Sequence, residues 1–204
     1  MHPIKIERSA LIVVDVQNGF CHENGSMSKL GKDVSMCVAV VEPCRRLVEA
    51  AHAVDITVIY TRIVYRADYS DRGVMPHAIR PALKENRACV IGTWDAEIVS
   101  ELAPEDRDYV FDKNRVSAFY NTGMETTLRS LDIRTVVVCG VTTSMCVEST
   151  VRDAGQRDYR TFVVADATGE LDRARHDAAL VSMGYMFAHV VSVDDVLAAW
   201  GRTQ

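Results

Sequence analysis

The chain has 204 residues, of which 48% are hydrophobic, 25% charged and 7% aromatic. This composition is typical of a globular protein with one core, and it argues against a disordered chain or a disulfide-rich miniprotein. With 23 basic against 28 acidic residues, the formal net charge of −5 disfavours general binding to nucleic acid or to an anionic membrane. We predict a single domain over residues 1–204.

Six short runs of apolar and β-branched residues predict strands, at 9–14, 56–61, 108–111, 134–139, 160–165 and 186–191. Their nearly continuous Val and Ile content is typical of strands that are buried on both faces. Helical patterns lie between them, at 41–51, 124–131, 146–154, 174–183 and 193–200. This alternation predicts an α/β fold in three layers, with a parallel sheet covered by helices on both faces. No glycine-rich nucleotide-binding motif follows any of the strands.

Apolar runs and cysteines indicate the compartment. The run at 11–14 ends at Asp15, far short of the ~18 residues of a membrane span, and residues 1–5 lack the order of a signal peptide. The six cysteines show no CxxC and no paired spacing, which argues against zinc and disulfide frameworks. We therefore expect a cytoplasmic protein with free thiols and no membrane partner.

The connection at 62–87 is long and has little apolar periodicity. It carries six basic side chains against three acidic ones, a local balance of +3. Two interpretations are open: a solvated surface loop, or a lid over an active site that attracts an anionic substrate.

Two charged residues lie just after predicted strands. Asp15 comes after the first strand, where a carboxylate either caps a turn or has a function. Lys113 follows the third strand and is either a surface lysine or a partner for Asp15. Carboxyl ends of parallel strands form the ligand-binding edge of an open sheet, so the functional interpretations converge on one place.

Cys146 lies in a pattern of strand, tight turn and helix start. Gly140 permits the turn, and a hydroxyl from residues 142–144 can cap the helix. A thiol in the first turn of a helix feels its positive end, which favours the thiolate. Cys21, near Asp15, is the rival thiol, and we interpret the others as packing residues: Cys37, Cys44, Cys89 and Cys139. His22 is the one histidine near this edge, so a different base is expected.

Three stretches resemble the isochorismatase-like cysteine hydrolase superfamily: ALIVVDVQNGF (10–20), FDKNRVSAF (111–119) and VVVCGVTTSMCVESTVRDAGQRDYRTFVVADATG (136–169). The resemblance spans nearly the whole chain. It implies a Rossmann-like sheet of six strands in the order 3-2-1-4-5-6 and a catalytic triad of Asp15, Lys113 and Cys146. It also implies a cis peptide bond before Thr142, with the backbone N–H groups of Thr142 and Cys146 directed at an oxyanion.

The branch of this superfamily follows from two features. Members that hydrolyse the isochorismate vinyl ether typically lack the cysteine, so Cys146 favours the amide and ureido hydrolases. Nicotinamidases of this superfamily bind a metal through an Asp-Trp-His segment after the second strand, but residues 61–68 contain no histidine and the next is His77. We expect no metal and no cofactor.

These features predict a metal-independent amidase that works through a thioester on Cys146. Phe20 and Trp94 are expected in the pocket walls, although core packing is an equal alternative for Trp94. Arg62 either clamps a substrate carboxylate or forms a surface salt bridge. Two residues of the matching stretches, Gln17 and Phe119, are also assigned to substrate binding.

Two other functions stay open: a vinyl ether hydrolase in which Cys146 is a bystander, and a catalytically silent binding protein. An intact triad argues against the silent protein. The resemblance also suggests a homodimer or homotetramer, in which neighbouring subunits could contribute to the site. Substrate identity depends on loops whose shape the sequence does not give.

Overall fold

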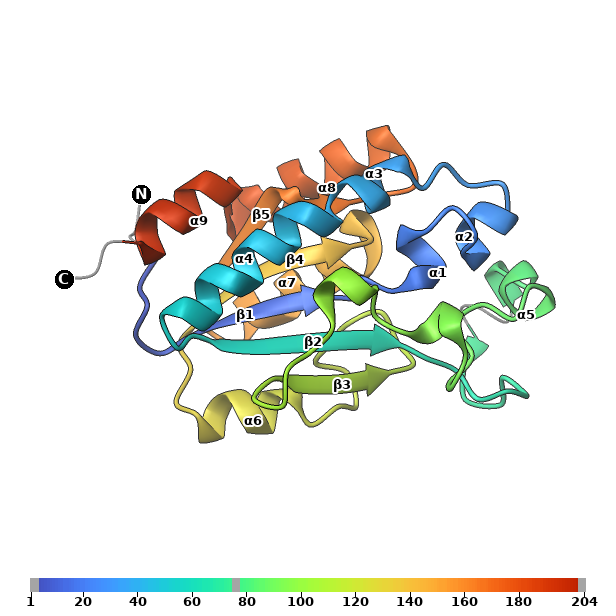
Figure 1. Ribbon diagram of the computed structural model, residues 1–204, viewed down its shortest axis with the longest axis horizontal. Coiled ribbons are helices and arrows are strands. Elements are labelled where there is room, and N and C mark those ends of the chain that lie inside the picture. The colour runs from blue at the N-terminus through green and yellow to red at the C-terminus, as the bar shows by residue number, and fades with distance from the viewer. Residues whose placement is uncertain (1–3, 75–77, 202–204) are drawn as a thin grey trace.

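The computed structural model describes residues 4–74 and 78–201. A six-stranded parallel sheet forms its centre, in the order β3-β2-β1-β4-β5-β6 (Figure 1). The strands are β1 (Ser9–Val14), β2 (Thr57–Ile63), β3 (Tyr109–Lys113), β4 (Thr135–Val141), β5 (Arg160–Gly169) and β6 (His189–Val191). The predicted α/β fold and its strand order are confirmed.

Helices cover both faces of the sheet (Figure 1). In chain order they are α1 (Asn18–Cys21), α2 (Ser26–Lys29), α3 (Ser35–Ala39), α4 (Val41–Ala53), α5 (Ala82–Glu85), α6 (Met124–Ser130), α7 (Glu148–Gln156), α8 (Arg173–Met186) and α9 (Val193–Trp200). Helices α4 and α9 pack on one face, and α6, α7 and α8 pack on the other. No helix within residues 4–74 and 78–201 is both long and apolar enough to cross a membrane.

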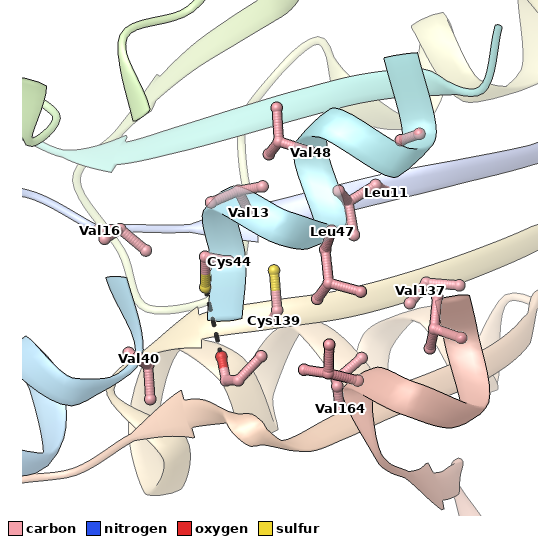
Figure 2. Close-up of a cluster of buried hydrophobic side chains, with 14 of the residues drawn as sticks. Leu11, Val13, Val16, Val40, Cys44, Leu47, Val48, Val137, Cys139 and Val164 are labelled. Carbon is pink, nitrogen blue, oxygen red and sulfur yellow. Dashed lines mark hydrogen bonds between the residues drawn. The ribbon is translucent and has the colours of Figure 1, made fainter. Parts of the chain in front are cut away.

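The core explains the continuous apolar runs of the strands. Successive residues of β1 point to opposite faces, so that Leu11 and Val13 meet α4 while Ile12 and Val14 meet the other helices. Figure 2 shows the first of these layers, with Cys44 of α4 against Val13 and Cys139. The Cys44 thiol donates to the Ala167 carbonyl oxygen at 3.5 Å. Because helices cover both faces of the sheet, residues 10–14 of β1 are all apolar and do not alternate with polar residues.

Several boundaries differ from those predicted. Strands β2, β4 and β5 run two to four residues further toward the carboxyl edge than the apolar runs indicated. Main-chain pairing with neighbouring strands continues past the last apolar residue, so polar residues such as Arg62 remain inside a strand. Strand β6 begins later than predicted because α8 continues to Met186.

Candidate active site

The side chains singled out at strand ends meet at the carboxyl edge of the sheet. Asp15 follows β1, Lys113 ends β3, and Cys146 lies in a π-helical turn, Thr143–Val147, between β4 and α7. Asp15 and Lys113 are 98 positions apart in the sequence, and the order of the strands brings them into contact. The structure therefore assembles all three residues in one place.

Asp15 and Lys113 form a buried ion pair. Lys113 Nζ lies 2.7 Å from Asp15 Oδ2, and neither side chain is exposed to solvent. The Thr61 hydroxyl donates to the other carboxylate oxygen at 2.7 Å, and Lys113 Nζ also donates to the Arg115 carbonyl oxygen at 3.2 Å. These partners offset the cost of removing both charges from water.

The Cys146 thiol is buried beside this ion pair. Burial raises the pKa of Cys146 to about 12; the Lys113 ammonium acts in the opposite direction, and the Asp15 carboxylate raises the pKa further. Burial lowers the pKa of Lys113, but the interactions with the Asp15 carboxylate, and to a smaller extent with the Cys146 sulfur, outweigh it, so the pKa lies above its usual value. The thiolate expected from a helix start is therefore disfavoured in the resting protein, because burial dominates.

The turn that carries Cys146 begins at a close contact between strands. Gly140 has φ +112°, and a Cβ at this position would collide with the Val14 carbonyl oxygen of β1. Only glycine fits there. The peptide bond between Val141 and Thr142 is cis, at the position that the family resemblance implies.

The last residue of β5, the glutamate that follows it and a histidine of α8 contact this turn. The Thr143 hydroxyl donates to the Gly169 carbonyl oxygen at 3.0 Å and lies 2.9 Å from His176 Nδ1. The Ser144 backbone N–H and hydroxyl both donate to Glu170 Oε2, at 2.8 and 2.6 Å. The described turn has no side-chain cap of the kind predicted from residues 142–144, and the hydroxyls of Thr143 and Ser144 bond to Gly169 and Glu170 instead.

A cavity of about 410 Å³ opens beside Cys146. Phe20 lines it, as predicted, together with Thr142. Segment 62–87 contributes further wall residues: Ile63, Tyr65, Ile79, Arg80 and Leu83. Helix α5 of this segment lies at the end of the molecule toward which the strands point (Figure 1). The described part of the segment is therefore next to the candidate site, and His77 lies outside the described residues.

Two polar residues assigned to the pocket have other contacts. Arg62 makes a bidentate ion pair with Asp112 on the adjacent strand β3, at 2.7 and 2.9 Å, away from the cavity wall. This corrects the carboxylate clamp and supports the surface salt bridge. Gln17 is fully buried and bonds to Ile63 and Ala96, with Nε2 donating to both carbonyl oxygens and Oε1 accepting from the Ile63 N–H. Its side chain is not part of the cavity wall, and both of its N–H donors are used within the protein.

Two aromatic assignments are corrected in the same way. Trp94 is 45% exposed and packs edge-on against His22, beside a different surface hollow. Trp94 is therefore neither in the wall of the cavity beside Cys146 nor in the core. Phe119 is buried against Tyr159 under the Arg157 guanidinium, on the face of the sheet covered by α6, α7 and α8.

The five other cysteines differ in whether they line the cavity beside Cys146. All six cysteines are buried and free. Cys37, Cys44 and Cys139 belong to the core, as expected. Cys21 does not line the cavity that contains Cys146, whereas Cys89 does. Cys89 is also packed into a buried hydrophobic cluster, as expected, so it combines a packing role with a place in the cavity wall.

The sequence of the chain matches a known protein family. The family model described as the isochorismatase domain matches residues 9–195. The chain belongs to the isochorismatase family. It is 36% identical to the ureidoacrylate amidohydrolase RutB of Methylorubrum extorquens strain AM1 over 200 residues, covering 92% of this chain and 80% of the relative. The corresponding protein of Acinetobacter baylyi is also 36% identical, over 97% of this chain and 86% of its own length.

Solved structures of the family agree with this membership. A cysteine hydrolase from Pseudomonas syringae pv. phaseolicola superposes with a TM-score of 0.89 at 32% identity, covering 98% of this chain and 96% of the other. N-carbamoylsarcosine amidase from Thermoplasma acidophilum gives a TM-score of 0.76 at 28% identity, covering 94% and 98%. These relatives place the chain among the amide hydrolases of the isochorismatase family, which confirms the resemblance seen in the sequence.

Across residues 4–74 and 78–201, no cluster of three or more His, Cys, Asp or Glu side chains is arranged to hold a metal ion.

Proposed function

We propose that this amide hydrolase cleaves a C–N bond of a small ureido or amide substrate through a thioester on Cys146. The observation that carries the proposal is the buried Asp15–Lys113 ion pair beside a thiol that lines a cavity. The names of the relatives, ureidoacrylate amidohydrolase and N-carbamoylsarcosine amidase, support ureido compounds as the substrate class.

In this mechanism Asp15 is the general base. Because the pKa of Cys146 is raised to about 12, the sulfur carries its proton at neutral pH. Asp15 accepts that proton while Sγ attacks the substrate carbonyl carbon, and Lys113 keeps the Asp15 carboxylate oriented. Transfer of the proton during attack avoids forming a buried thiolate in the resting protein.

Proton transfers through Asp15 complete the acylation step and then the hydrolysis of the thioester. The bond between the carbonyl carbon and nitrogen breaks as Asp15 gives the proton to the departing ammonia or amine. A water molecule then attacks the thioester carbon and gives one proton to Asp15, and the carbon–sulfur bond breaks. Asp15 finally returns that proton to Sγ, which restores the resting thiol.

The oxyanion formed in both steps needs hydrogen-bond donors. We assign this role to the backbone N–H groups of Thr142 and Cys146, which belong to two residues lining the cavity. A donor of this kind typically contributes about 3 kcal/mol to transition-state stabilisation. The anchoring of the turn to Gly169 and Glu170 would keep these donors fixed during the reaction.

Ammonia release from small amides and ureido acids, with mass spectrometry for an acyl adduct, tests the proposal. Cys146→Ala should lose turnover and adduct together, while Cys89→Ala, the matched change at the other cavity thiol, should retain both. Near-wild-type ammonia release by Cys146→Ala would overturn the thioester mechanism.

Two outcomes would favour the other functions. Turnover of isochorismate by Cys146→Ala would indicate vinyl ether hydrolysis with the thiol as a bystander. A protein that releases no ammonia and whose Cys146 is not labelled by an electrophilic amide or aldehyde probe would be a silent binding protein.

We also propose that the protein acts as a homo-oligomer in a reducing, cytoplasmic environment, which suits its free thiols. Helix α8 exposes large apolar side chains that a partner could cover: Val181 is 75% exposed, Tyr185 87% and Met186 74%. Sedimentation of wild type and Tyr185→Glu tests this, since a monomeric wild type would contradict it.

A further inference from the structure

The wall of the cavity beside Cys146 carries unequal numbers of charges. It contains four cationic side chains, Lys32, Arg80, Arg115 and Arg175, and two carboxylates, Glu170 and Asp172. Whether this excess is available to a substrate depends on how many of these charges are already neutralised within the protein.

Both carboxylates use the same arginine. Glu170 Oε1 accepts a hydrogen bond from Arg175 Nη2 at 3.0 Å, and Asp172 Oδ1 lies 4.0 Å from Arg175 Nε. Arg175 is therefore committed to these acidic groups. Within residues 4–74 and 78–201, the other three wall cations form no ion pair with a carboxylate. The described wall thus keeps a net charge of +2, since its four cations outnumber its two carboxylates, and its cations without an ion pair are Lys32, Arg80 and Arg115.

Arg115 differs from the other two unpaired cations. Lys32 and Arg80 are exposed, so water screens their charges, whereas Arg115 is half-buried. The backbone also links it to the reacting groups, because its carbonyl oxygen accepts a hydrogen bond from Lys113 Nζ at 3.2 Å. Of the three, Arg115 is the cation whose position is tied to the Asp15–Lys113 pair.

Hydrogen bonds from Nη1 fix one side of the Arg115 guanidinium. Its Nη1 donates to the carbonyl oxygens of Asp71 and Asn114 at 3.0 and 2.7 Å. Nη2 lies against the backbone of Gly73, where a Cβ would collide with it. In the described part of the chain, neither Nε nor Nη2 has a hydrogen-bond partner. These two donors form the geometry that binds a carboxylate through two parallel hydrogen bonds.

We propose that Arg115 binds a substrate carboxylate, and that the substrates are therefore ureido or amido acids rather than neutral amides. The inference rests on the proposed function, because it assumes that the scissile carbonyl is at Cys146. The role first considered for Arg62 thus belongs to an arginine of the cavity wall. Arg115 would determine specificity by anchoring the acid group while the reacting carbonyl meets the sulfur.

The experiment compares ureido acids of two to four carbons with the matched ureido alcohols, in which a hydroxymethyl group replaces the carboxylate. Ammonia release is measured for wild type, Arg115→Gln and Arg115→Lys. Arg62→Gln is the matched control, because it removes an arginine whose ion pair lies outside the cavity.

Wild type should cleave an acid more efficiently than its alcohol. Arg115→Gln should raise KM for the acids about 10- to 100-fold, the range expected for a lost charge-assisted hydrogen bond, and leave kcat/KM for the alcohols within about twofold. Arg115→Lys should recover part of the loss for the acids. Arg62→Gln should change neither series.

Three results would overturn the inference. Equal losses for acids and alcohols in Arg115→Gln would indicate a structural role at Asp71 and Asn114, and a fall in thermal unfolding temperature would accompany them. Unchanged KM for the acids would remove Arg115 from substrate binding while leaving the thioester mechanism intact. Absence of ammonia release from every acid and alcohol by wild type would contradict the proposed function itself, and the inference with it.

Discussion

The Thr61 hydroxyl lies 2.7 Å from Asp15 Oδ1 and donates a hydrogen bond to it. Thr61 is buried in β2, and the Asp15 backbone N–H donates to its carbonyl oxygen at 3.1 Å. With Lys113 on Oδ2, each carboxylate oxygen of Asp15 has one donor of its own. The orientation of the proposed base is therefore set by two neighbouring strands, of which one supplies a charge and the other a neutral hydroxyl.

Replacing Thr61 by Val tests this hydroxyl with little change of volume. The variant leaves one oxygen of a buried carboxylate without its donor, at a cost of about 1–3 kcal/mol. We expect kcat/KM to fall about tenfold in an ammonia-release assay, with KM nearly unchanged. Thr61→Ser keeps the donor and should retain most of the activity. Wild-type kinetics in Thr61→Val would show that Lys113 alone orients Asp15.

Replacing Lys113 by Met should cost both activity and stability. Removal of one partner leaves the Asp15 charge buried without its counterion, which typically destabilises a protein by about 3–5 kcal/mol. We expect urea unfolding to show a loss of this size and ammonia release to be abolished.

The double variant Asp15→Asn/Lys113→Met separates these two effects. It removes both charges, so it should recover much of the lost stability while remaining inactive. A single variant Lys113→Met as stable as wild type would contradict a buried charge pair. An active double variant would contradict the proposed role of Asp15.

Alkylation of Cys146 by iodoacetamide reports its ionisation. Burial raises the pKa of Cys146 from its usual value of 9.0 to about 12, and a raised pKa favours the neutral thiol. The reactive thiolate fraction should then increase about tenfold per pH unit, and the alkylation rate should rise from pH 7 to 9 without a plateau. Peptide mass spectrometry follows Cys146 separately from the other thiols, with Cys146→Ala as the blank. A plateau below pH 8 would instead indicate a preformed thiolate.

The sequence predicts the sheet well because its signals are local. Apolar runs such as Ser9–Val14 mark strands that are buried on both faces, and the residue types at their ends mark the carboxyl edge. Asp15, Lys113 and Cys146 were found in this way. Thr61 was not, because a threonine inside a strand is an ordinary β-former whose hydroxyl partner cannot be read from its neighbours.

The walls of the cavity were predicted poorly for a different reason. Gln17 and Phe119 lie in motif stretches, yet Gln17 bonds to the backbone of Ile63 and Ala96 and Phe119 packs against Tyr159. Arg62 and Arg115 are both basic residues near strand ends. Only the position of Asp112 next to Arg62 on the neighbouring strand decides which of them is neutralised. Such pairings depend on strand register, which residue type alone does not specify.

Glu170 provides a final test, because its carboxylate fastens the Cys146 turn to β5. It accepts hydrogen bonds from the Ser144 N–H and hydroxyl, the Leu171 N–H and Arg175, and its side chain is 1% exposed. Glu170→Gln would turn an NH₂ group toward donors, leaving at least one buried group unpaired at a cost of about 1–3 kcal/mol. We expect urea unfolding to show this loss and kcat to fall more than KM rises.

Asp172→Asn is the matched control for that variant. Asp172 is an exposed carboxylate that also lies near Arg175 and caps α8, and asparagine caps a helix nearly as well. It should change the free energy of unfolding and kcat little. Because Cys146 should also become more accessible when its turn loosens, Glu170→Gln is expected to react faster with iodoacetamide at fixed pH. Equal stability, kcat and alkylation rate in Glu170→Gln and Asp172→Asn would show that the turn keeps its position without Glu170.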